Sequence, residues 1–69
     1  MTRMRGPLGR EIFIEIVTVG TFAKVSAIDS ETGIEVSITG PANADRDTLE
    51  AAAVAKLEYM LKKQDSDAR

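Results

Sequence analysis

The sequence contains no cysteine, no histidine and no tryptophan. The absence of cysteine excludes disulfide bonds and thiolate metal sites, and the absence of histidine excludes imidazole ligands, Ser-His-Asp triads and imidazole acid–base catalysis. Lys24 and Tyr59 are then the candidate bases or nucleophiles, but neither has an activating neighbour in the sequence. We therefore expect a protein that is not an enzyme, binds no cofactor and takes no small-molecule substrate.

One small acidic cluster is the candidate for a metal site. Asp45, Asp47 and Glu50 fall close together, but no EF-hand loop surrounds them. Asp47 and Glu50 have the spacing of an acidic capping box, and either aspartate can accept hydrogen bonds at the start of a helix. The cluster predicts helix capping and no bound metal.

Long apolar runs are also missing. The longest uncharged stretch is far below the about 20 residues that span a membrane. Glu11 and Glu15 interrupt the segment that follows the basic N-terminus, and no cleavage site of a signal peptide appears. We expect a cytoplasmic protein without membrane contact.

The charge is nearly balanced but uneven along the chain. Nine lysines and arginines against eleven aspartates and glutamates give a net charge of −2, unlike the basic balance of domains that rely on phosphate contacts. Three of the basic residues, Arg3, Arg5 and Arg10, lie in the first ten positions. They are the candidate nucleic-acid contacts, although three arginines provide only weak, salt-sensitive binding.

The chain is short for a domain without cross-links. With 69 residues, it can bury only about three-fifths of its unfolded surface. Its composition, 43% apolar and 29% charged, is nevertheless typical of a globular protein. The sequence predicts a single domain with a thin core.

Hydrophobic periodicity divides the chain into an arm, three strands, a helix and a tail. Residues 1–10 have no such period and predict a flexible basic arm. Residues 45–63 predict a helix with one apolar face, and residues 64–69 predict a frayed polar tail. Three segments rich in β-branched and aromatic side chains predict strands: residues 11–19, 22–29 and 34–39.

Turn residues fix the order and register of these strands. Gly20 and Thr21 fit a two-residue hairpin, and Gly33 ends a longer turn in which Asp29 can bond its own backbone. Short connections of this kind place consecutive strands side by side and antiparallel. The predicted fold is α+β over residues 11–63: a three-stranded antiparallel meander in the order 1-2-3, with one C-terminal helix packed on one face (β-β-β-α).

The register sorts the side chains onto two faces of the sheet. One face is apolar throughout and predicts a core against the helix. The residues of this core are Ile14, Ile16, Ala23, Val25, Ala27, Ile34, Val36 and Ile38 from the strands, with Leu49, Ala53, Val54, Leu57, Met60 and Leu61 from the helix. The other face mixes polar residues with five large apolar ones, more than scattered exposure explains. These five are Phe13, Val17, Val19, Phe22 and Ile28, and they predict an interface.

Three strands followed by an alanine-rich helix resemble the second half of double-stranded RNA-binding domains, over residues 12–61. The helix that carries Leu49, Leu57 and Leu61 looks like the last helix of that family. Two departures matter: the first helix of the family is missing, and the lysines that grip phosphates at the helix start are replaced here by Asp45-Arg46-Asp47. An acidic helix start repels the nucleic-acid backbone.

A second resemblance covers most of the chain from Arg10 onward. The motifs Ala27-Ile28-Asp29, Thr32-Gly33-Ile34-Glu35-Val36-Ser37-Ile38, Gly40-Pro41-Ala42, Leu49, Ala55-Lys56-Leu57 and Tyr59 resemble a family of short uncharacterised bacterial proteins, a domain of unknown function. The resemblance implies a compact cytosolic domain. It assigns no functional residues.

The function expected from the sequence is therefore interaction with protein. The thin core and the five leftover apolar side chains favour a non-enzymatic module that self-associates, as a homodimer or with another protein partner, through the open sheet face or a sheet edge. The alternative is weak nucleic-acid binding through the N-terminal arginines.

Overall fold

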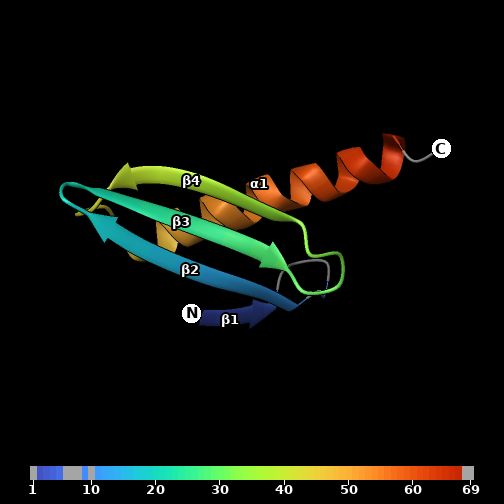
Figure 1. Cartoon of the computed structure of the whole chain (residues 1–69), viewed down its shortest axis with the longest axis horizontal. Helices are drawn as coiled ribbons and strands as arrows, with labels where there is room; N and C mark the ends of the chain where they lie inside the picture. The colour runs from blue at the N-terminus through green and yellow to red at the C-terminus, as the bar shows by residue number, and fades with distance from the viewer. Residues whose placement is uncertain (1, 6–8, 10, 68–69) are drawn as a thin grey trace.

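A computed structural model of the chain describes residues 2–5, 9 and 11–67. It contains one antiparallel sheet of four strands in the order β1-β2-β3-β4 and one helix (Figure 1). The elements are β1 (Thr2–Arg5), β2 (Glu11–Val19), β3 (Phe22–Asp29), β4 (Glu35–Pro41) and α1 (Arg46–Asp67). The predicted β-β-β-α arrangement is confirmed as β2, β3, β4 and α1.

The predicted registers of the two hairpins are also confirmed. Val19 lies opposite Phe22 and Ile16 opposite Val25 in the first hairpin, and Val25 lies opposite Ile38 in the second. Gly20 has a φ of +60°, the backbone conformation that a type II′ turn requires at its first central residue. The two-residue turn thereby fixes which side chains share a face.

The first strand differs from the sequence expectation. Residues 1–10 were expected to form an irregular arm, yet Thr2–Arg5 pairs with β2, so that Arg3 lies opposite Phe13. Four residues are too few for a hydrophobic period to be read, and the strand forms because β2 offers an otherwise unpaired edge. Residues 1, 6–8 and 10 of the expected arm lie outside the described residues.

The helix also runs further than expected. It begins at Arg46 and continues to Asp67, through most of the segment predicted as a frayed tail. No glycine or proline stands between residues 62 and 67, and each further residue adds one backbone hydrogen bond once a helix has formed. In Figure 1, the C-terminal end of α1 extends beyond the sheet.

β4 extends to Pro41, two residues beyond the predicted end of this strand at residue 39. Ala42 N donates to Thr21 O at 2.8 Å across the hairpin. Because pairing groups alternate along an antiparallel strand, the backbone nitrogen of Pro41 then faces away from β3. The missing N–H of proline costs no ladder hydrogen bond at this position.

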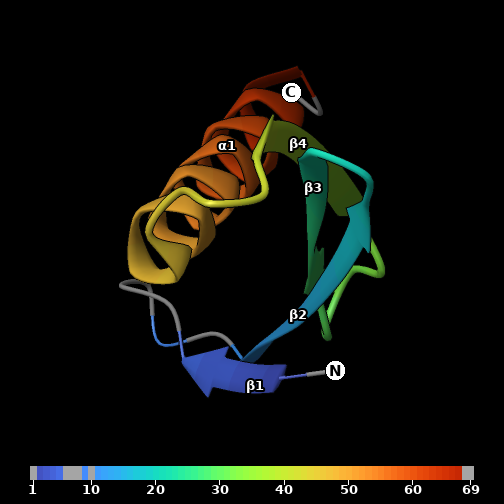
Figure 2. The same ribbon diagram turned by 90° about the vertical axis from the view of Figure 1, so that its left-hand side faces the viewer.

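The core lies between α1 and the face of the sheet that the sequence assigned to it. Figure 2 shows α1 on the concave side of the curved sheet, where it packs on β3 and β4. The buried apolar residues include Ile12, Ile14, Val25, Ala27, Val36, Ala53, Val54, Leu57 and Leu61. Of the residues predicted for this core, Met60 is 39% exposed because it stands at the margin of the apolar arc, whereas Ile12 was not predicted and is buried.

Two local contacts lie at opposite ends of β3, one at each end of the core. A Cβ at Gly40 would lie only 2.7 Å from Leu49 Cδ2, so the glycine allows the start of the helix to approach β4 closely. At the other end, Asp29 is fully buried and its Oδ2 accepts hydrogen bonds from Thr32 N at 3.0 Å and Thr32 Oγ1 at 2.7 Å. The expected use of Asp29 as a turn residue is confirmed.

Candidate interaction surface

The side of the sheet that faces away from α1 carries the side chains predicted as an interface, and we call it the open face. The strand registers arrange it in four rows across β2, β3 and β4. In order along the strands these are row 1 (Phe13, Ile28, Glu35), row 2 (Glu15, Ser26, Ser37), row 3 (Val17, Lys24, Thr39) and row 4 (Val19, Phe22, Pro41). Rows 1 and 4 each contain two large apolar side chains, in row 1 together with the exposed Glu35, and mostly polar side chains lie between them.

The five predicted interface residues divide into two groups. Val17, Val19 and Phe22 are exposed by 45%, 64% and 63%, and we call these three the hairpin patch. Phe13 and Ile28 are half-buried. Among the described residues, β1 pairs with the stretch of β2 from Glu11 to Ile14, which includes Phe13, and not with the stretch that carries Val17 and Val19. Phe22 is the first residue of β3, next to the turn, whereas Ile28 lies near the other end of that strand.

Phe22 stands beside two shallow hollows of the surface. One, of about 700 Å³, is lined by the β2–β3 turn and the end of β4: Gly20, Thr21, Phe22, Thr39, Gly40, Pro41, Ala42 and Asn43. The other, of about 320 Å³, lies among Val19, Phe22, Lys24 and Thr39. Exposed apolar side chains next to such hollows are typical of a surface that binds another protein.

The middle rows combine a satisfied polar pair with two exposed charges. Ser26 is buried, and its Oγ lies 3.0 Å from Ser37 Oγ, within hydrogen-bond distance. Glu15 and Lys24 are exposed. The centre of the open face therefore offers one negative and one positive charge on neighbouring strands.

A lysine of α1 binds the outer edge of β4 near the middle of the strand. Lys56 Nζ, from α1, donates to the Ser37 carbonyl at 2.9 Å. A lysine at a sheet edge hinders the addition of a further strand. No pattern in the sequence identifies this contact, because it joins residues 19 positions apart on different elements.

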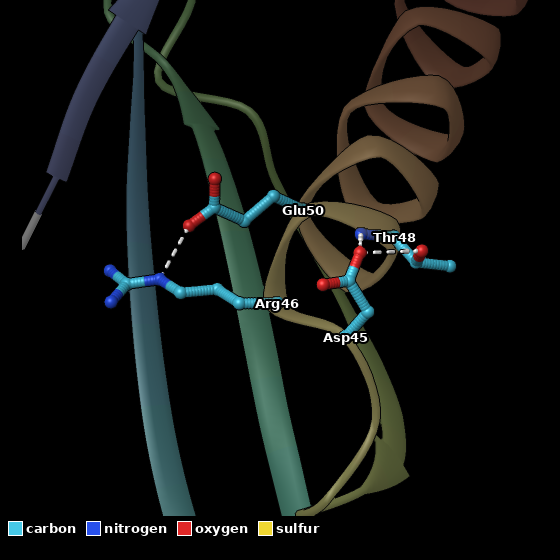
Figure 3. A network of polar contacts seen from close by, with 4 residues as sticks. All are labelled: Asp45, Arg46, Thr48 and Glu50. Carbon is cyan, nitrogen blue, oxygen red and sulfur yellow. Dashed lines mark hydrogen bonds and ion pairs between the residues drawn. The ribbon is translucent and has the colours of Figure 1, made fainter.

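The acidic cluster at the helix start has a structural use (Figure 3). Asp45 Oδ2 accepts hydrogen bonds from Thr48 N at 3.3 Å and Thr48 Oγ1 at 3.0 Å, so Asp45 is the capping residue. Glu50 was predicted to complete a capping box with Asp47, but its Oε2 accepts from Arg46 Nε at 2.9 Å instead. Among the described residues, no three potential ligands form a group that could hold a metal ion.

The other candidates are not brought together. Lys24 lies on the open face, whereas Tyr59 is on α1, which packs against the opposite face. Arg3 and Arg5 belong to β1, and Arg10 lies outside the described residues, as do the side chains of the other two arginines. Nucleic-acid contact through these three arginines stays a prediction.

Within the described residues, no helix is both long and apolar enough to cross a membrane.

A family model described as "Domain of unknown function (DUF6898)" matches residues 9–64, which include β2, β3, β4 and nearly all of α1. Neither the curated proteins nor the solved structures contain a match to the chain. The predicted resemblance to a family of unknown function is therefore confirmed.

Proposed function

Since the chain belongs to the DUF6898 family, whose description assigns no activity, we propose its function from its surface: a small, non-enzymatic protein-interaction module that self-associates through the open face. We place this module in the cytoplasm, in keeping with a sequence that contains no cysteine.

The hairpin patch carries the proposal. Val19 and Phe22 are both more than 60% exposed, lie opposite each other in the register and share their face with Val17. A domain of 69 residues needs most of its apolar side chains for its core, yet in this one three large apolar side chains are exposed to water at one end of the sheet. Burial of such a patch against a second surface contributes about 25 cal/mol for each Å² removed from water.

The edge of β4 is less suited to association than the open face. β1 covers the first half of β2, and Lys56 occupies the Ser37 carbonyl on the outer side of β4. Pro41 ends β4 without an N–H group to donate. These features disfavour the addition of a strand along β4 and beside the paired part of β2, and they support association through the face.

Sedimentation equilibrium tests the proposal with a matched pair of variants. Phe22→Glu places a charge in the hairpin patch, and Tyr59→Glu places the same charge at an aromatic residue of equal exposure, 63%, on α1. We expect the wild type and Tyr59→Glu to form dimers in the high micromolar range and Phe22→Glu to stay monomeric, with unchanged circular dichroism. A wild type that is strictly monomeric at these concentrations would contradict the proposal.

A further inference from the structure

We propose that two copies of this chain pack open face to open face about a two-fold axis that runs across the strands, so that Lys24 of each copy lies against Glu15 of the other. This inference rests on the proposed function and adds the arrangement of the dimer. It commits to a second copy of this chain as the occupant of the open face.

Symmetry leaves two simple arrangements for aligned sheets. Sheets that pack face to face keep their strands within about 30° of each other, so a two-fold axis between them runs either along the strands or across them. An axis along β3 places each row on the same row of the second copy. An axis across the strands, centred between rows 2 and 3, places row 3 on row 2 and row 4 on row 1.

Charge distinguishes the two arrangements. With the axis along β3, the exposed Lys24 of one copy faces Lys24 of the other, and like charges opposed across an interface are unfavourable. With the axis across the strands, Lys24 faces Ser26 of the second copy and has Glu15 beside it, because Glu15 and Ser26 share row 2. Two such pairs form, one on each side of the axis.

Both charges are available for a contact of this kind. Glu15 and Lys24 are exposed and lie diagonally on neighbouring strands. Among the contacts of the described residues, neither side chain takes part in a hydrogen bond or an ion pair. The dimer provides each of them with a partner of opposite charge.

The apolar rows also complement each other across the strands. Row 4, with Val19 and Phe22, meets row 1 of the second copy, which presents the half-buried Phe13 and Ile28. Val17 in row 3 lies over Glu15 in row 2 of the second copy, beside the Lys24–Glu15 pair, so that all five predicted interface residues lie in the interface. The orientation that places Lys24 beside Glu15 of the second copy therefore also brings the apolar side chains of row 4 onto those of row 1.

The size of the face sets the expected strength. β4 has seven residues, and with a rise of about 3.4 Å per residue and a strand spacing of about 4.8 Å, β2, β3 and β4 cover a flat area of about 340 Å². Specific interfaces average about 800 Å² of accessible surface for each partner, so a face of this size falls below that class and among weak, transient contacts. We therefore expect a weak dimer with a dissociation constant of about 10–100 μM.

Variants that neutralise one charge test the orientation, because the two arrangements predict opposite changes in the dissociation constant for Lys24→Gln. If the axis runs across the strands, Lys24→Gln and Glu15→Gln each remove two attractive pairs, and we expect the dissociation constant to rise about threefold to tenfold. If the axis runs along β3, Lys24→Gln removes a repulsion and strengthens the dimer. Lys62→Gln on α1 is the control and leaves the constant unchanged.

A mixing experiment separates contacts between copies from contacts within one copy. Glu15→Lys and Lys24→Glu each place like charges against each other in a homodimer, so we expect each variant alone to dimerise about tenfold more weakly than the wild type. In an equimolar mixture both cross-pairs are attractive, and native mass spectrometry should show the heterodimer in excess over both homodimers.

Different results overturn different parts of this account. A dimer that Phe22→Glu dissociates but that Lys24→Gln strengthens or leaves unchanged overturns the orientation and keeps the proposed function. A homodimer of Lys24→Glu as strong as that of the wild type also overturns the orientation. A monomeric wild type overturns both.

Discussion

Asp29 is both a turn residue and a fully buried side chain. Its side chain is fully buried, and two hydrogen bonds from Thr32 to one carboxyl oxygen hold the loop between β3 and β4. Thr32 Oγ1 in turn accepts from Ile34 N at 3.2 Å, so the same contacts guide the chain into β4. The sequence predicted an aspartate that bonds its own turn, because Asp before a glycine-containing turn is typical of this use. The depth of its burial depends on how the strands pack and was not predicted.

We expect Asp29→Ala to lower the free energy of unfolding by about 2–4 kcal/mol, because it removes both hydrogen bonds to Thr32 and leaves a cavity. Urea unfolding monitored by circular dichroism measures the change. Asp47→Ala, at an exposed aspartate in the first turn of α1, is the control and should change stability by about 0.5 kcal/mol or less. Equal effects of the two substitutions would show that the Asp29 contacts are dispensable.

Among the elements, those with a clear period in the sequence were predicted and those without one were not. β2, β3 and β4 are apparent from their β-branched residues and from turns at Gly20 and Gly33, both of which have positive φ. β1 has four residues and exists through its pairing with β2, which is a contact at a distance along the chain. The last turns of α1 are polar and begin with the good helix formers Lys62, Lys63 and Gln64, so the helix propagates from its packed part to Asp67 although no apolar period marks its end.

The contact between α1 and the edge of β4 gives a prediction at this scale. Because Ala42 N pairs with Thr21 O, alternate residues of β4 from Pro41 back to Glu35 turn their backbone groups outward. Lys56 occupies the Ser37 carbonyl in the middle of that edge. We expect Lys56→Ala to expose the edge and to accelerate the formation of thioflavin-positive aggregates several-fold at high micromolar concentration.

Lys62→Ala is the matched control for this experiment, since Lys62 is an exposed lysine of the same helix that makes no hydrogen bond to another described residue. It should aggregate at the rate of the wild type. If Lys56→Ala and Lys62→Ala aggregate equally slowly, the edge of β4 does not need protection and the lysine contact is incidental.

On the scale of the whole molecule, the open face shows which part of the site was predictable. All five apolar residues were assigned to the correct side of the sheet, because a two-residue turn fixes the register and successive side chains of a strand point to opposite faces. Their unequal exposure was not predicted. On β2, Phe13 lies within the stretch that pairs with β1, and Val17 and Val19 lie beyond it among the described residues.

A chain of this size that buries part of its surface only against a second copy should be more stable when concentrated. The proposed dimer is favoured by mass action over a monomeric unfolded chain, so the proposal predicts a midpoint of thermal unfolding that depends on protein concentration. For a domain of 69 residues, 1 kcal/mol shifts the midpoint by about 4–8 °C. We expect a hundredfold increase in concentration through the dimerisation range to raise the midpoint of the wild type by about 3–6 °C. Tyr59→Glu should retain this dependence, and Phe22→Glu should have a midpoint that stays constant. A constant midpoint for the wild type would mean that the hairpin patch remains in water at every concentration, and that the thin core between α1 and the sheet is sufficient to stabilise the fold by itself.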